Sequence, residues 1–197
     1  RTGSGSDTFV ASLGDVNHLF NGGAGNDVAS FTNATLGLTV DMVSGTVRDA
    51  SASNQIGIDS LIGIETVVGG GGNDTFYAAG GNIANEFDGG AGAGNWADYS
   101  RVFADAATAN GLNFAFSAGQ WTVSSPTLDV GTDVLKNMQR VIGGKGSDTF
   151  SGIADAVTVD AGEGGISGLD VLDLTAQGNA LYVNLSALSG KAVDTVS

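Results

Sequence analysis

The sequence predicts an all-β protein made of short strands joined by turns, and three observations lead to this prediction. Glycine accounts for 33 of the 197 residues, whereas proline occurs once. The 21 acidic residues comprise 18 Asp and only 3 Glu. Short runs of alternating apolar and polar residues recur between glycine-aspartate turns. Because aspartate favours turns and glutamate favours helices, most of the negative charge is expected in turns between strands.

Three glycine-aspartate turns, each followed by threonine and phenylalanine, mark an internal repeat. Their aspartates are separated by 67 and 74 residues, and each turn is followed by an apolar strand, a second glycine turn and a hairpin. The first turns lie at residues 3–9, 70–76 and 144–150, the second turns at 20–27, 87–92 and 159–164, and the hairpins at 38–47, 112–123 and 181–190. Alternating residues bounded by glycine turns are typical of hairpins.

A closing segment of similar sequence ends the first two units, at residues 59–69 and 133–143. The chain therefore divides into three tandem units, 1–69, 70–143 and 144–197, and the third stops before its closing segment. Such a unit buries its apolar residues only by stacking on its neighbours. The chain also opens within a turn motif, so we expect it to be a piece of a longer protein.

The glycine-aspartate turns have the composition of a Ca²⁺ site. Ca²⁺ takes six to eight oxygen ligands in a tolerant geometry, glycine lets the backbone aim carbonyl groups inward, and aspartate adds a short charged ligand. The pattern Gly-Gly-x-Gly-x-Asp-x-apolar-x is that of a parallel β-roll around Ca²⁺. The alternative is that the aspartates only cap their turns. The candidate ligands are Asp7, Asp27, Asp74, Asp148 and Asp170, with Gly3, Gly5, Gly23, Gly25, Gly70, Gly72, Gly144 and Gly146.

A single turn offers half a cage, so a second turn must stack on it. Asp7 and Asp27 are 20 residues apart and Asp148 and Asp170 are 22 apart, close to the 18 or so residues of one β-roll coil. Unit two departs from the pattern, because Asn95-Trp96 stands where unit one has Asn26-Asp27. Its site is expected to be weaker. For Asp88 and Asp160, and for Asn21 in unit one, ligation and turn capping stay equally open, whereas Asp98, Asp173 and the matching Ser30 are expected to be edge or turn residues.

Charge and composition exclude several functions. The formal net charge is −14 and the sequence pI is about 4.1, which excludes a nucleic-acid binder. The chain has no run of about 18 apolar residues, so we expect no membrane insertion. It has no cysteine, which removes disulfides and thiolate chemistry.

We do not expect an enzyme. His18 is the single histidine, so the sequence predicts neither a zinc-binding histidine pair nor a Ser-His-Asp triad. The carboxylates repeat along the chain instead of converging, which argues against a glycosidase. Trp96, Trp121, Tyr99 and Tyr182 could form a sugar-stacking surface, but separate positions in the core or at its rim are expected.

These motifs resemble the repeats-in-toxin (hemolysin-type calcium-binding) superfamily, over essentially the whole chain. The likeness is strongest for the closing segments and for the turns at Asp74 and Asp148, and especially close to long bacterial surface proteins that alternate degenerate nonapeptides with such closing segments. The resemblance implies type I secretion from Gram-negative cells and calcium-triggered folding outside the cell. It also implies a parallel β-roll or β-helix.

We therefore predict an elongated, right-handed parallel β-roll or β-helix, a solenoid with hairpin excursions. Its expected function is that of a calcium-binding extracellular structural protein at the bacterial cell surface, such as an adhesin, a surface-layer protein or a filament subunit. Neighbouring copies in a fibre or lattice are the expected partners, together with calcium ions. The alternative is the calcium-binding accessory or secretion module of a secreted protease, lipase or alginate epimerase.

Overall fold

The computed structural model shows an all-β chain, as the sequence predicts. It describes residues 3–14, 16–50, 55–81, 83–102, 111–126, 130–153, 157–162 and 170–175. These residues form 17 strands in two sheets, and none of them lies in a helix. Accordingly, this part of the chain contains no helix that is long and apolar enough to cross a membrane.

The two sheets contain nine and eight strands, most of them only three to five residues long. In spatial order, the nine-stranded sheet contains β1 (Thr8–Val10), β3 (Val28–Ser30), β7 (Thr66–Val68), β9 (Glu86–Asp88), β13 (Asp133–Lys136), β12 (Gln120–Ser124), β11 (Asn113–Ser117), β15 (Thr149–Ser151) and β17 (Val171–Leu172). The eight-stranded sheet contains β16 (Thr158–Asp160), β14 (Arg140–Ile142), β10 (Trp96–Asp98), β8 (Thr75–Tyr77), β4 (Leu38–Asp41), β5 (Thr46–Asp49), β6 (Ile58–Ile62) and β2 (Leu19–Asn21).

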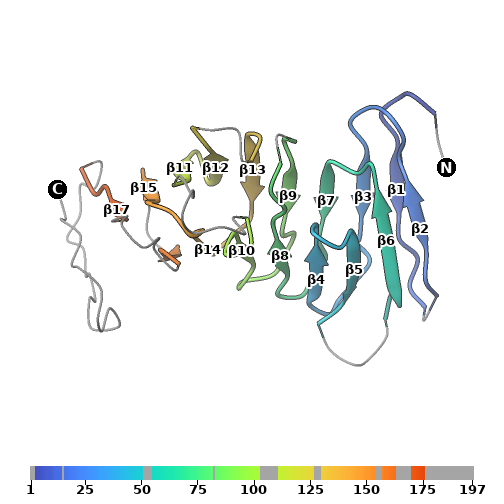
Figure 1. Cartoon of the computed structure of the whole chain (residues 1–197). Coiled ribbons are helices and arrows are strands. Elements are labelled where there is room, and N and C mark those ends of the chain that lie inside the picture. The colour runs from blue at the N-terminus through green and yellow to red at the C-terminus, as the bar shows by residue number, and fades with distance from the viewer. Residues whose placement is uncertain are drawn as a thin grey trace.

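The chain passes back and forth between the two sheets. β1, β3 and β7 pair in parallel in the nine-stranded sheet, while β8 pairs in parallel with β10 and β10 with β14 in the other. Figure 1 shows the strands following one another from β1 and β2 near the N-terminus to β17 near the C-terminus. Outside the meanders, strands inside each sheet thus pair in parallel with neighbours that are distant in sequence.

Both hairpins that fall within the described residues form as the sequence predicts. β4 pairs antiparallel with β5, and β11 pairs antiparallel with β12. They are not excursions from the sheets, however. Each hairpin joins the next strand to make a three-stranded antiparallel meander, β4–β5–β6 between β2 and β8 and β11–β12–β13 between β9 and β15. The third hairpin, expected at 181–190, lies outside the described residues.

The core lies between the two sheets and is rich in phenylalanine. The phenylalanine of each turn motif points inward: Phe76 and Phe150 are almost fully buried, and Phe9 packs against the core as a partly buried residue. Their rings contact aromatic rings from other strands, as in the Phe76–Phe87 and Phe114–Phe150 pairs at 5.2 and 4.5 Å between centroids. Burial of these rings supplies the main stabilisation of the stack.

We expect Phe76→Ala to lower the free energy of unfolding by about 3–5 kcal/mol, because it leaves a cavity in a fully buried position. Val10, which is 59% exposed on β1, provides the control: Val10→Ala should change stability by less than about 0.5 kcal/mol. Urea unfolding of the two variants measures both values. Equal losses would show that Phe76 does not lie in the core.

Candidate functional site

The first and second glycine turns of unit one lie against each other, as their spacing predicts. The N–H of Ala24 donates to the carbonyl oxygen of Gly3 at 3.2 Å. Gly25, at φ +142°, has no side chain to collide with the carbonyl oxygen of Gly5, which lies directly beside it. At the end of the turn, the N–H of Asp7 donates to Oδ1 of Asp27 at 2.8 Å. The two turns therefore stack through both their backbones and their aspartates.

The turns of units two and three also lie against each other. The N–H of Ala91 donates to the carbonyl oxygen of Gly70 at 2.9 Å, and the N–H of Gly143 donates to that of Asp160 at 2.8 Å. The N–H of Asp148 donates to Oδ1 of Asp170 at 2.9 Å, so this aspartate pair is the one that the sequence predicts.

The sequence alignment of the second turn in unit two is wrong by one residue. It placed Trp96 in the position of Asp27, whereas Trp96 lies opposite Thr75 in the parallel pair β8–β10. Asn95 therefore takes the place of Asp27, and its Oδ1 accepts the N–H of Asp74 at 2.8 Å. An amide thus replaces a carboxylate at one of the equivalent turns.

The turn aspartates cap the starts of neighbouring strands. Oδ1 of Asp74 accepts the N–H of Leu38 at 2.8 Å, and Oδ1 of Asp148 accepts that of Leu112 at 2.7 Å. Their Oδ2 atoms accept an N–H of their own turns, from Gly70 at 3.1 Å and Gly144 at 2.7 Å respectively. Turn capping, the alternative that the sequence left open, is therefore present at both positions, and calcium ligation remains a prediction.

Asp27 differs from these two aspartates. Its side chain is fully buried, but Oδ2 has no hydrogen-bond partner among the described residues. The carboxylate of Asp27 and the carbonyl oxygen of Gly63 both lie beside Gly22. A Cβ at position 22 would collide with both, so the site requires glycine. Two oxygens thus face a space that a glycine keeps open.

The same arrangement of a glycine beside a carboxylate and a carbonyl oxygen recurs at the other turns. A Cβ at Gly69 would collide with the carboxylate of Asp74. The carbonyl oxygen of Gly89 also lies close to this position. Gly143 lies in the same way beside the carboxylate of Asp148 and the carbonyl oxygen of Ala161. At the Asn95 position the carboxylate is replaced by an NH₂ group. This Nδ2 donates to three carbonyl oxygens, those of Gly89, Gly92 and Asn137, at 2.9, 3.2 and 3.0 Å.

The three carboxylates of Asp27, Asp74 and Asp148 lie away from positive charge. All three are fully buried, and within the described ranges none of them forms an ion pair with Lys, Arg or His. Burial raises the pKa of Asp74 to about 6 although the N–H groups of Leu38 and Gly70 lower it. Burial likewise raises the pKa of Asp148 to about 6. The turns therefore hold carboxyl groups that a nearby cation would stabilise in the charged form.

The predicted ligands Asp88 and Asp160 each cap their own turn. Oδ1 of Asp88 accepts the N–H of Gly90 at 2.9 Å, and Oδ1 of Asp160 accepts that of Gly162 at 3.2 Å. Asp160 also forms an ion pair with Arg140 at 2.8 Å. Asp98 and Asp173 accept turn N–H groups as expected of turn residues. Gly23 and Gly72 lie within the stacked turns, each with its carbonyl oxygen against a glycine of the next coil, and Gly146 is buried.

Sequence reasoning missed two buried aspartates, Asp59 and Asp133, which begin the matching closing segments. Both are fully buried. Oδ1 of Asp133 accepts the N–H of Asn85 at 2.8 Å and its Oδ2 accepts the hydroxyl of Tyr99 at 2.9 Å. Burial raises the pKa of Asp133, and burial together with the negative Asp133 raises that of Tyr99 well above its usual range. The repeat of aspartate at the same place in two units was the available signal.

The expectation that no Ser-His-Asp arrangement forms is also wrong. Ser12, His18 and Asp59 are joined in series by hydrogen bonds, because β2 and β6 pair in parallel and place residue 18 opposite residue 59. The expected separation of the aromatic residues holds for the described ones. Trp121 and Tyr99 are in the core, whereas Trp96 is 38% exposed beneath the guanidinium of Arg140. Tyr182 lies outside the described residues.

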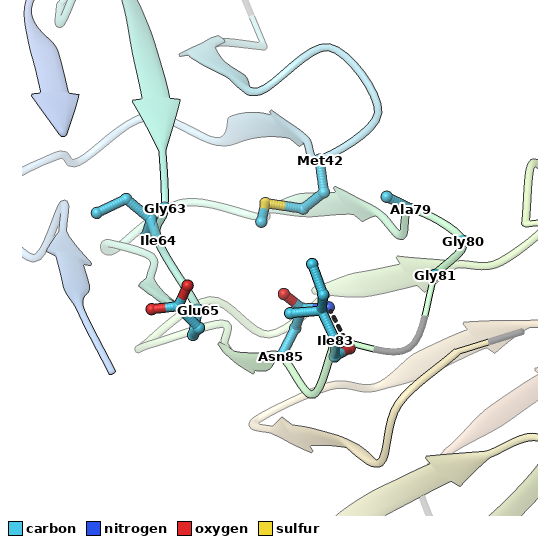
Figure 2. A pocket seen from close by; sticks show the side chains of 9 residues that line it. All are labelled: Met42, Gly63, Ile64, Glu65, Ala79, Gly80, Gly81, Ile83 and Asn85. Carbon is cyan, nitrogen blue, oxygen red and sulfur yellow. Dashed lines mark hydrogen bonds between the residues drawn. The ribbon is translucent and has the colours of Figure 1, made fainter. Parts of the chain in front are cut away.

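A small open hollow lies beside the first meander. β6 and β8 are separated by two strands in one sheet, but the strands that follow them, β7 and β9, are neighbours in the other. The two connections therefore converge, and the hollow lies between them (Figure 2). Its lining is Met42, Gly63, Ile64, Glu65, Ala79, Gly80, Gly81, Ile83 and Asn85. Glu65 belongs to the stacked turns, because its Oε2 accepts the N–H of Asp27 at 2.9 Å.

Comparison with known proteins adds no family to this geometry. No protein-family model matches the chain, and no curated protein matches it either. In the part of the chain that the structure describes, no group of three or more His, Asp or Glu side chains is placed to hold a metal ion. The turns offer backbone carbonyl oxygens together with the carboxylates of Asp27, Asp74 and Asp148, and an amide at Asn95.

We expect the calcium-free chain to lose stability as the pH rises from about 4 to about 6. The folded chain holds the protons of Asp74 and Asp148 up to about pH 6, whereas the unfolded chain releases them near pH 4. The unfolded state thus binds fewer protons in this interval, so stability falls with rising pH. Asp74→Asn, which copies the natural Asn95, should reduce the fall.

Urea unfolding in calcium-free buffer at pH 4.5 and pH 6.5 measures this fall in the free energy of unfolding. The two pH values span most of the interval between the pKa values of the unfolded and folded chain. Asp98→Asn, at an outward-facing turn position, is the control and should keep the wild-type difference. A wild-type difference retained in Asp74→Asn would contradict the assignment.

Proposed function

We propose that the chain is a segment of a calcium-dependent extracellular structural protein, built as a right-handed parallel β-roll or β-helix. The passage of single strands between two sheets and the stacking of glycine turns along one edge of each coil support a solenoid. Its function is then structural, as in an adhesin, a surface-layer protein or a filament subunit. The protein reaches the cell surface by secretion and completes its folding when it meets calcium outside the cell.

The difference between Asn95 and the equivalent aspartates is the observation that carries this proposal. At Asn95 an NH₂ group donates to three carbonyl oxygens. At Asp27 a carboxylate occupies the same place in the turn, and its Oδ2 has no donor among the described residues. A buried carboxylate beside carbonyl oxygens is repulsive unless a cation lies between them. Calcium prefers such a set of oxygens.

The residues that would hold the ion are the turn aspartates and the glycines around them. Asp27, Asp74 and Asp148 would each supply a carboxylate oxygen, and the stacked turns would supply carbonyl oxygens. Bound calcium supplies the positive charge that these acidic turns lack. Because such an ion binds the folded chain and not the unfolded one, it stabilises the fold by mass action.

Self-association is the second part of the proposal. β2 and β16 end the eight-stranded sheet and β1 and β17 end the nine-stranded sheet, so within the described ranges each has one edge without a partner strand. Such edges readily accept another strand. We propose that further coils or neighbouring copies cover them in a fibre or lattice.

The calcium-free chain should show weak β-type circular dichroism and a low unfolding temperature, and millimolar calcium should increase both. The reason is the repulsion among buried carboxylates in a chain of net charge −14. Magnesium at the same concentration should have little effect, because it demands a tighter octahedral shell. Identical spectra and unfolding temperatures with calcium and with chelator would contradict the proposal.

Two reciprocal variants test the role of the turn residues. Asp27→Asn should raise the calcium-free stability and lose part of the calcium-induced rise in unfolding temperature, because its NH₂ group can donate to carbonyl oxygens that the carboxylate repels. Asn95→Asp should lower the calcium-free stability and enlarge the calcium-induced rise, because it exchanges an NH₂ donor for a carboxylate facing carbonyl oxygens. Asp98→Asn is the matched control. If all three variants respond to calcium as the wild type does, the turns are not the site.

A further inference from the structure

Three side chains near the start of the chain form a hydrogen-bonded series that the structural role does not use. Ser12 follows β1, His18 immediately precedes β2 and Asp59 lies in β6. Oγ of Ser12 lies 3.3 Å from Nε2 of His18, and Nδ1 of His18 lies 2.9 Å from Oδ1 of Asp59. The order is that of a nucleophile, a base and an acid that orients the base.

The histidine ring is held in one orientation. Asp59 is fully buried, and its Oδ1 also accepts the backbone N–H of His18 at 2.7 Å. The imidazole lies nearly parallel to the ring of Phe20, at 5.8 Å between centroids and 9° between planes. Because an ionised carboxylate only accepts hydrogen bonds, Nδ1 carries the proton and Nε2 presents its lone pair to Ser12. This is the tautomer that a general base requires.

The backbone and side chain around Ser12 are accessible at the surface. Ser12 is exposed, and its own N–H and that of Leu13 have no hydrogen-bond partner among the described residues. These two N–H groups are available to a developing oxyanion. Leu13, Val16 and Leu19 are 51%, 58% and 60% exposed. They offer apolar surface close in sequence to the serine, suited to a short apolar acyl group.

We propose that Ser12 is an activated nucleophile that transfers the acyl group of small, apolar carboxylic esters to water. Oγ attacks the ester carbonyl carbon while its proton passes to Nε2 of His18. The ester C–O bond breaks, and the leaving alcohol takes that proton. Water then attacks the acyl-serine, giving its proton to Nε2, and the C–Oγ bond breaks as Oγ regains a proton. The net reaction is ester plus water giving acid plus alcohol, with no change of oxidation state.

The roles of the three residues are distinct. Ser12 and His18 are the catalytic residues, because they exchange the proton and Ser12 bonds to the acyl carbon. Asp59 is a positioning residue, since it acts through the imidazole and does not touch the ester. General-base assistance typically accelerates such a step by about 10²–10⁴-fold, so removal of the imidazole should slow acylation of Ser12 by at least about a hundredfold.

An alkyl fluorophosphonate and p-nitrophenyl acetate are the probes, used on the folded chain with millimolar calcium. We expect mass spectrometry to find the phosphonyl group on Ser12 and ester hydrolysis above the buffer rate. Ser12→Ala should abolish both, and His18→Gln should slow both by the factor above. Ser44→Ala, at an exposed serine that bonds Thr46, is the control and should react as the wild type does. No labelling of the wild type, or equal labelling in His18→Gln, would overturn the proposal.

The positioning role of Asp59 is tested by a measurement that a purely structural role would leave unchanged. ¹⁵N chemical shifts of the imidazole should report the Nδ1–H tautomer in the wild type and its loss in Asp59→Asn, together with slower labelling of Ser12. An unchanged tautomer with unchanged labelling would remove Asp59 from the series. If Asp59→Asn does not fold, Ser12→Ala, which changes an exposed side chain, still decides the proposal.

Discussion

The structure depends on buried side-chain oxygens at the beginnings of its strands. Most strands contain three to five residues, too few to fix their register by ladder hydrogen bonds alone. At the start of strand after strand, a side chain accepts the backbone N–H of the corresponding residue at or just before the start of the neighbouring strand of the same sheet. Each cap satisfies an N–H at a coil corner and fixes the next strand in position. The cost is that charged groups are buried beside carbonyl oxygens.

The meanders and the hollow follow from the same stacking. The first meander places three strands side by side in one sheet. The strands that follow β6 and β8 along the chain, β7 and β9, are neighbours in the other sheet, so the connections β6–β7 and β8–β9 must converge. The first meander lies in the eight-stranded sheet and the second in the nine-stranded sheet, with four single strands between them. Because that number is even, successive meanders fall in opposite sheets. The extra width is thereby shared between the two faces of the molecule.

The sequence predicted the parts of the fold that local spacing determines. The two hairpins and the pairs Asp7–Asp27 and Asp148–Asp170 follow from alternation and from the length of one coil. Asn95 was misplaced because a one-residue shift in a turn is invisible without strand register. Asp59 was missed because its partner, His18, is 41 residues away and reaches it only through the β2–β6 pair, which the meander creates. Features set by local spacing could be predicted from the sequence, whereas features set by the register of strands that are distant in sequence could not.

Amide hydrogen exchange at Leu38 and Leu112 tests the central claim most directly. Among the described residues, these two N–H groups donate to the carboxylates of Asp74 and Asp148 on the neighbouring turns. If buried carboxylates fix the strand starts, both amides exchange as slowly as the ladder amides of the core, because exchange then requires opening of the stack. Exchange at the rate of the exposed turn amide of Gly119 would contradict the claim.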